Sequence, residues 1–167
     1  MHYKILNEDQ QQLMPLLSKF KKEFYMVGGT STALHIGHKL SIDFDLFKQA
    51  KIRPLNIRSI FKQSNEKIQV ALNREGQFNW VCRNSKFTFI EYAYPVSHPV
   101  ILDNGLAIPR LLDVAAMKTF GLGMLSKWKD YLDLYFNVRT ILTLMRFPKR
   151  QVSILAPCLV KNYLGGN

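Results

Sequence analysis

Residues 25–47 read Tyr-Met-Val-Gly-Gly-Thr-Ser-Thr-Ala-Leu-His-Ile-Gly-His-Lys-Leu-Ser-Ile-Asp-Phe-Asp-Leu-Phe, and this stretch decides the fold. The apolar run over 24–27 stops at a pair of glycines, which predicts a short buried strand followed by a tight turn. Thr30 is suited to cap a helix over 30–36. Residues 42–47 alternate apolar and acidic side chains, which predicts a second strand with Asp43 and Asp45 on one face.

This order of elements would bring a glycine turn and a helix N-terminus next to two carboxylates. Glycine lets a backbone approach a ligand closely, and the N–H groups of a helix N-terminus favour an anion. Asp43 and Asp45 can share Mg²⁺, which prefers oxygen ligands and shares its shell with substrate phosphates. A lone Asp-X-Asp is usually just the polar side of a strand, but the glycines upstream favour a site for phosphoryl or nucleotidyl transfer.

The segments on either side predict a mixed fold of the α+β or α/β class. Asn7 and Gln10 form a capping box that starts a first helix, and Pro15 is expected to kink that helix or delay its start. The other predicted elements are a helix over 54–63, strands over 67–73, 78–83 and 86–94, and helices over 110–122, 128–145 and 148–164.

Pro95 and Pro99 are expected to end the sheet. We therefore divide the chain into an α/β core over 1–108 and a C-terminal helical segment over 109–167 that packs on the core, so that the two parts can form one compact domain.

The composition is that of a globular protein with a strong positive charge. The chain has 167 residues, 47% of them hydrophobic and 21% charged, and a net charge of +11. Residues 1–50 carry 6 basic and 5 acidic side chains, 51–100 carry 8 and 3, and 101–167 carry 9 and 4. Disordered, collagen-like and coiled-coil chains are excluded. The charge favours a polyanion partner, with a merely soluble basic surface as the plain alternative.

The sequence also suggests where the protein works. Cys82 and Cys158 lie far apart in the chain, so neither a disulfide framework nor a zinc site is expected. The first residues lack the apolar segment of a secretory signal, and the longest apolar stretch, over 152–160, is too short to span a bilayer. We expect a cytoplasmic protein with no membrane partner.

The glycine pair and the two aspartates resemble the signature of the DNA polymerase beta-like nucleotidyltransferase superfamily. More narrowly, residues 25–30 and 37–47 are similar to the AbiEii/AbiGii toxin family of nucleotidyltransferases, and residues 92–95, 112–118 and 127–136 are similar to its later motifs. The resemblance implies a nucleotidyltransferase-type mixed sheet flanked by helices and followed by a C-terminal helical segment. It also implies a toxin of a toxin–antitoxin pair that transfers a nucleoside monophosphate from an NTP, with Mg²⁺ or Mn²⁺ as cofactor. The implied acceptor is an RNA, such as a tRNA end, or a protein hydroxyl, and the implied protein partner is a cognate antitoxin.

The resemblance carries over residue by residue. Gly28, Gly29 and Thr30 match the turn that binds the nucleotide phosphates, and Asp43 and Asp45 match the catalytic metal ligands.

The later motifs imply catalytic and nucleotide-binding roles for Lys118 and Lys129, and a catalytic role for Asp130. A lysine at either position could neutralise the triphosphate. The plain alternatives are an exposed helix lysine for Lys118 and a solvated acid early in a helix for Asp130.

One position departs from the family pattern. The family has a third carboxylate before its Tyr-Pro-Tyr-Pro stretch, which serves as the base that activates the attacking hydroxyl. Counting back from Pro95, that position is Thr88, which cannot act as a carboxylate base. Glu91 is the candidate replacement, but on a regular strand it points to the other face unless a bulge re-aims it. Either the register differs, or two carboxylates suffice, or the site is weakened.

Three functions follow as hypotheses. The first is a nucleotidyltransferase that acts on an RNA or protein hydroxyl. The second is a weakened relative that binds RNA or an antitoxin without chemistry. The third, an antibiotic-modifying enzyme, is disfavoured by the net charge of +11, because cationic drugs prefer acidic clefts.

Overall fold

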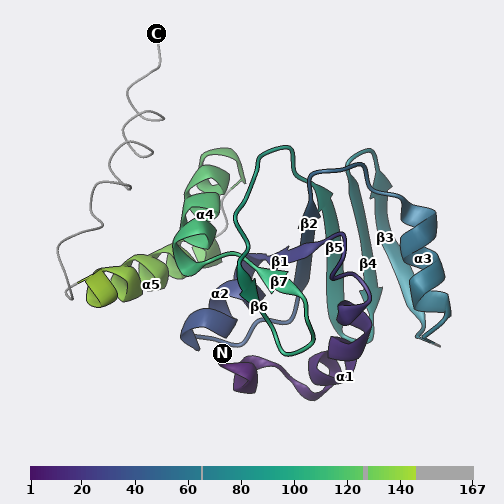
Figure 1. Cartoon of the computed structure of the whole chain (residues 1–167), viewed down its shortest axis with the longest axis horizontal. Coiled ribbons are helices and arrows are strands. Elements are labelled where there is room, and N and C mark those ends of the chain that lie inside the picture. The colour runs from purple at the N-terminus through teal and green to yellow at the C-terminus, as the bar shows by residue number, and fades with distance from the viewer. Residues whose placement is uncertain (65, 126–127, 146–167) are drawn as a thin grey trace, which may run out of the picture.

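A computed structural model describes residues 1–64, 66–125 and 128–145, without the side chains of 120–125, 128–130, 133, 144 and 145. The elements are, in chain order, η1 (Tyr3–Ile5), α1 (Glu8–Ser18), β1 (Tyr25–Val27), α2 (Gly28–Ile36), β2 (Phe44–Lys48), α3 (Pro54–Lys62), β3 (Ile68–Arg74), β4 (Gln77–Cys82), β5 (Ser85–Glu91), β6 (Val100–Ile101), β7 (Ala107–Ile108), α4 (Leu111–Leu125) and α5 (Trp128–Met145) (Figure 1).

The strands form one mixed sheet in the order β3-β4-β5-β2-β1-β7-β6. β1 pairs antiparallel with β2 and parallel with β7, and β2 pairs parallel with β5. The strands β3, β4 and β5 follow one another as antiparallel hairpins, as the turn signals between them predict. The expected mixed sheet flanked by helices is confirmed.

The main core lies between one face of the sheet and the helices α1 and α3. Leu17 of α1 and Phe61 of α3 are fully buried there with Phe44, Trp80 and Phe87 of the strands. β2 alternates strictly, being buried at 44, 46 and 48 and half-buried at 45 and 47. This alternation turns residues 45 and 47 toward the opposite face of the sheet.

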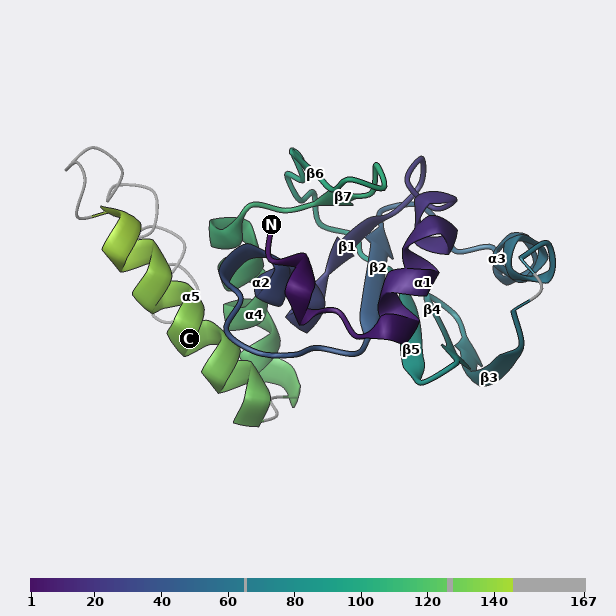
Figure 2. The ribbon, with the colours of Figure 1, turned by 90° about the horizontal axis from the view of Figure 1, so that it is seen from below.

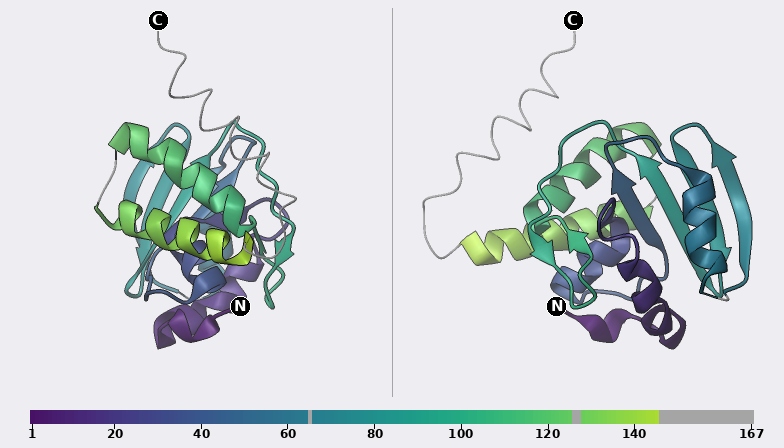
Figure 3. Two further views of the ribbon diagram at one scale, coloured as in Figure 1. Left: turned by 90° about the vertical axis from the view of Figure 1, so that its left-hand side faces the viewer. Right: turned by 45° about the vertical axis from the view of Figure 1, so that its right-hand side comes forward.

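The remaining helices gather at the other end of the molecule. α2 follows β1 directly, α4 packs on α5, and both pack on α2. Seen from below, these helices stand at the β1 side of the sheet and α3 stands at the far side (Figure 2). α4 and α5 lie alongside one another there (Figure 3).

The first helix confirms one prediction and corrects another. The backbone N–H of Gln10 donates to Asn7 Oδ1 over 2.9 Å, and that of Asn7 donates to Gln10 Oε1 over 3.1 Å, so the capping box is present. The helix begins at Glu8 and includes Pro15, so the expectation of a delayed start is wrong.

Four further expectations differ from the structure. α2 begins at Gly28, with Val27 as its N-cap, so Thr30 lies inside the helix and does not cap it. β2 begins at Phe44, so Asp43 precedes the strand instead of belonging to it. Pro95 and Pro99 do not end the sheet, because β6 and β7 add to it beside β1. β5 ends at Glu91 rather than at residue 94. The helix expected over 148–164 lies outside the described residues, and the division at 108/109 stays a prediction.

Candidate active site

The glycine turn lies directly against one aspartate. Gly28 has a φ of +75°, and a Cβ added there would lie 2.0 Å from Asp45 Oδ2 and 2.9 Å from Asp45 Cγ. The register explains the contact, because Val27, the last residue of β1, pairs with Asp45 of β2. Glycine is therefore needed for two reasons, its left-handed backbone and the space that the Asp45 carboxylate occupies.

Thr30 and Gln10 hold the segment that carries the other aspartate. The hydroxyl of Thr30 donates to the backbone carbonyl of Asp43, and its Oγ1 lies 3.0 Å from Ser41 Oγ. Gln10 Nε2 donates to the carbonyl of Ser41 over 2.7 Å. Residues 41–43 are thus fixed by helix side chains instead of by a neighbouring strand, which is why β2 starts one residue after Asp43. The hydroxyl of Thr30, which we expected to bind phosphate, orders the Asp43 backbone.

Asp45 lies in an environment that disfavours its charge. Burial raises the pKa of the Asp45 carboxyl above its usual range, and the nearby charge of Asp43 raises this pKa further. A hydrogen bond with Thr88 and the positive charges of Lys118 and Lys86 oppose this rise. The two aspartates are therefore close enough to repel each other, and two lysines are close enough to act on Asp45.

Thr88 occupies the position beside Asp45 on the next strand. The parallel ladder of β2 and β5 pairs Asp45 with Thr88, and Thr88 is buried. Glu91 pairs with Lys48 three residues further along, which is the opposite face of the sheet. Among the described residues, no group of three acidic, histidine or cysteine side chains could hold a metal ion. The structure thus brings Asp43, Asp45 and Thr88 together and leaves Glu91 apart.

Of the two lysines predicted from the later motifs, the structure describes the side chain of Lys118 only. Lys118 lies on α4, and its positive charge acts on Asp45. The catalytic and nucleotide-binding roles of Lys118 stay predictions. Lys129 and Asp130 are placed on α5, but their side chains lie outside the described residues.

Two residues of this region were not predicted from the sequence. Lys86 stands two residues before Thr88 on β5, so it shares the face of Asp45, and the strand period could have indicated it. Ser31 lies in the first turn of α2, and its buried hydroxyl has no hydrogen-bond partner among the described residues. No sequence signal distinguishes Ser31 from its hydroxyl-bearing neighbours.

The donor set fits a divalent cation that is shared with a substrate. Asp43 and Asp45 supply carboxylate oxygens only, and the hollow that Gly28 leaves is filled by one of them. Mg²⁺ is usually held by one or two carboxylates together with substrate phosphates, and it tolerates an incomplete protein shell. The first-turn N–H groups of α2, from Gly28 onward, lack partners within the helix and favour an anion beside the cation.

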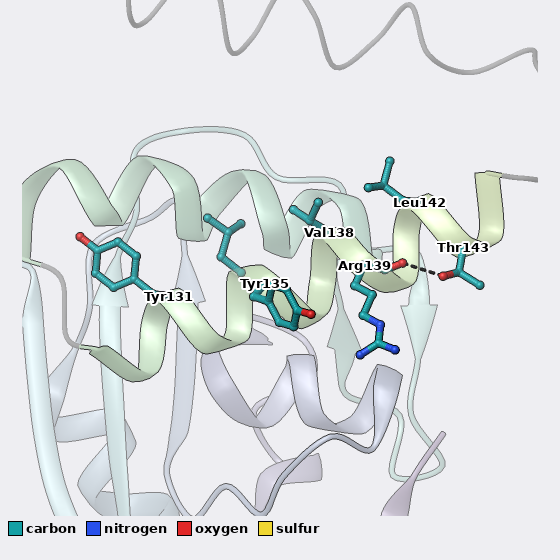
Figure 4. Close-up of a pocket in the computed structure, with 7 residues that line it drawn as sticks. Tyr131, Tyr135, Val138, Arg139, Leu142 and Thr143 are labelled. Atoms are coloured by element: carbon teal, nitrogen blue, oxygen red, sulfur yellow. Dashed lines mark hydrogen bonds between the residues drawn. The ribbon is translucent and has the colours of Figure 1, made fainter.

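A separate pocket of about 750 Å³ runs along α5. The pocket is lined by side chains that stand out from α5, namely Tyr131, Tyr135, Val138, Arg139 and Leu142 (Figure 4). Among the candidate site residues whose side chains the structure describes, none lines this pocket. Within the described ranges, we find no helix with the length and hydrophobicity that crossing a membrane requires.

Comparison of the sequence with known proteins gives a limited result. No protein-family model matches the chain, so membership of the AbiEii/AbiGii family is not confirmed. An uncharacterized protein of Aquifex aeolicus (strain VF5) is 28% identical over 141 residues, which are 81% of this chain and 68% of that protein.

Comparison of the structure identifies the fold. An H. pylori protein assigned as a nucleotidyltransferase is similar with a TM-score of 0.57 and 17% identity, over 78% of this chain and 68% of that one. The Megavirus polyadenylate synthase is similar with a TM-score of 0.58 and 11% identity, over 83% of this chain but 32% of the viral enzyme. The antibiotic-resistance factor ANT(2'')-Ia is similar with a TM-score of 0.56 and 11% identity, over 80% of this chain and 85% of that one. The chain has a nucleotidyltransferase fold.

Proposed function

We propose that the protein is a metal-dependent nucleotidyltransferase that transfers a nucleoside monophosphate from an NTP to a hydroxyl of RNA. The observation that carries the proposal is the contact between Gly28 and the Asp45 carboxylate, with Asp43 beside it. This arrangement aligns the start of α2, which favours phosphates, with two oxygen ligands for a divalent cation. The fold, shared with nucleotidyltransferases, supports the proposal.

The chemistry follows from the residues on this face. The RNA hydroxyl oxygen forms a bond to the α-phosphorus, the bond from that phosphorus to the bridging oxygen breaks, and pyrophosphate leaves. A bound divalent cation would neutralise charge on the phosphates. Asp43 and Asp45 would hold this cation, and Lys118 adds positive charge near Asp45. Thr88 cannot act as a carboxylate base, so the proposed step releases the hydroxyl proton to solvent water without a third carboxylate.

RNA is the acceptor that the charge of the chain favours. The net charge is +11, and no acidic residue follows Arg139. The excess of positive charge would attract the negatively charged backbone of an RNA. A role as the toxin of a toxin–antitoxin pair rests on the resemblance of residues 25–47, and an acidic antitoxin would suit the same basic surface.

Thr88 favours a second candidate function. With a threonine where a third carboxylate would stand beside Asp45, the fold could bind RNA or an antitoxin without transferring a nucleotide. The two candidates differ in one observable property, the incorporation of label, because only the enzyme forms a covalent product.

Incubation of the protein with each labelled NTP, Mg²⁺ and total RNA tests the proposal. We expect the label of at least one NTP to appear in RNA, and to be lost when EDTA replaces Mg²⁺. Asp103→Asn serves as a matched control for aspartate variants of the site, because Asp103 is an exposed aspartate of the turn between β6 and β7. RNA that binds tightly but gains no label from any NTP would support the binding protein instead.

A further inference from the structure

A group of aromatic side chains lies on the same face of the sheet as Asp45. Tyr25 of β1 pairs with Phe47 of β2, two residues along the strands from the Val27–Asp45 pair. Residues two apart on a strand share a face, so Tyr25 and Phe47 lie about 7 Å along the strands from the candidate active site. They pack with Val27, Ala107, Val96 and Met117 and not with the main core on the other face.

The aromatic contacts continue from these strands to the surface. The ring centroid of Phe47 lies 5.3 Å from that of Tyr92, and the centroid of Tyr92 lies 5.5 Å from that of Tyr94. The backbone N–H of Tyr92 donates to the carbonyl of Lys48 over 2.8 Å, which extends the β2–β5 ladder and fixes the start of the segment 92–99. We call Tyr25, Phe47, Tyr92, Tyr94 and His98 the aromatic row.

Exposure increases from Tyr25 to Tyr94, while His98 is an exposed ring that covers the buried Tyr25. Tyr25 is 4% exposed and Tyr94 is 57% exposed. A tyrosine that is more than half exposed contributes little to a core, yet the Tyr94 ring is held in an edge contact with the Tyr92 ring, with the two planes at 63°. A supported, accessible ring loses little conformational freedom when a second ring stacks on it.

The inner end of the row carries an unused hydrogen-bonding group. His98 is stacked on Tyr25, with centroids 4.5 Å apart and planes at 5°. The hydroxyl of Tyr25 is buried and has no hydrogen-bond partner among the described residues. Buried polar groups are nearly always paired, so this hydroxyl indicates a partner that the described residues do not supply.

We propose that the exposed end of the aromatic row, at Tyr94, stacks a nucleobase on the face of the sheet that carries Asp45, on the far side of Phe47 from the two aspartates. The proposal rests on the function proposed above, and it adds where a base is bound. Proteins that bind single-stranded nucleic acid commonly stack bases on aromatic side chains next to positive charge, and Lys86 and Lys118 supply such charge near Asp45. The base belongs either to the NTP or to the last nucleotide of the RNA acceptor, since both meet at the α-phosphorus.

Packing alone is the competing explanation, in which the row merely anchors the segment 92–99. A base-dependent measurement separates the two, because a packing role affects ligands with and without a base equally. The variant is Tyr94→Ala, and the control is Tyr135→Ala, which removes a tyrosine of equal exposure (58%) from α5.

The experiment measures binding in Mg²⁺ with no turnover. The RNA arm uses a labelled oligoadenylate and the same strand with an abasic terminal nucleotide; the nucleotide arm uses ATP and inorganic triphosphate. Loss of a stacked base weakens binding by about 5- to 150-fold. We expect Tyr94→Ala to weaken the binding of oligoadenylate or of ATP by at least about fivefold. The binding of the matching ligand without a base, the abasic strand or triphosphate, should weaken much less. Tyr94→Trp should retain affinity.

The arm that responds identifies the source of the base. Equal effects on ligands with and without a base, or equal effects of Tyr94→Ala and Tyr135→Ala, would overturn the proposal. So would full affinity of Tyr94→Ala in both arms. Failure of the proposed function has another signature, because base-dependent binding would persist while no NTP label reaches RNA.

Discussion

Gly28 and Asp45 are the residues whose contact links the fold to the proposed chemistry. The space above Gly28 is filled by Asp45 Oδ2, and the charge of that carboxylate is opposed by Lys118 and Lys86. A change at either residue should therefore alter metal binding and nucleotide transfer more than it alters the stability of the fold.

Gly28→Ala should reduce transfer by about a hundredfold, because the new methyl group displaces a carboxylate that must be positioned within about 1 Å. Gly76→Ala is the matched control. Gly76 has a φ of +70°, but its added Cβ would meet nothing closer than Glu91 Cβ at 3.9 Å. Both variants should lose about 1–2 kcal/mol of stability in urea unfolding. Equal activities would contradict the role given to the Gly28 contact.

Asp45→Asn should stabilise the metal-free protein at neutral pH. The folded-state pKa of Asp45 is raised above the unfolded value, so the native state holds its proton longer. Stability therefore falls as pH rises from about 4 through the folded-state pKa, and levels off above it. Urea unfolding in EDTA from pH 4 to pH 8 should show this fall in the wild type and less of it in Asp45→Asn. Parallel curves would refute the assignment.

At the scale of elements, the start of β2 is set by side chains of α1 and α2. Thr30 binds the carbonyl of Asp43 and Gln10 binds that of Ser41. This anchoring, rather than strand pairing, positions Asp43 beside Asp45.

Thr30→Val should therefore lower the free energy of unfolding by about 1–3 kcal/mol, since it leaves a carbonyl without its partner. It should also weaken Mg²⁺ binding, measured by calorimetry with a non-hydrolysable NTP. Thr30→Ser should retain both properties. Thr32→Val is the control, because the hydroxyl of Thr32 bonds to Gly28 within the same helix over 3.1 Å. Unchanged metal affinity in Thr30→Val would show that Asp43 needs no anchoring.

The sequence predicted most elements between residues 7 and 94, because hydrophobic period, glycines and prolines act locally. The prediction failed where contacts with residues far apart in the sequence determine where a strand begins or which strand it pairs with. The alternation over 42–47 includes Ile42, but Ile42 is 52% exposed and Asp43 precedes the strand. β6 and β7 were missed because two-residue strands give no pattern. Their pairing beside β1 depends on tertiary contacts.

At the scale of the whole molecule, charge should govern how RNA is bound. The affinity for single-stranded RNA should fall with salt at a log–log slope of about −0.7 per phosphate contact. Replacing Arg146, Lys149 and Arg150 with Gln should flatten the slope and weaken binding to all sequences alike. These three residues lie outside the described part of the chain, and Arg139 is the exposed member of the same basic series within it. A slope near zero in the wild type would remove the electrostatic role.

The most direct test of the central claim is the single-turnover rate of NTP label transfer to RNA by wild type, Asp43→Asn and Asp45→Asn, each shown by circular dichroism to be folded. If the two carboxylates hold the metal, each variant should lose at least about a thousandfold in rate, since the cation contributes several kcal/mol to the transition state. Asp103→Asn should transfer at the wild-type rate. A folded Asp45→Asn variant that transfers nucleotide at the wild-type rate would contradict the account.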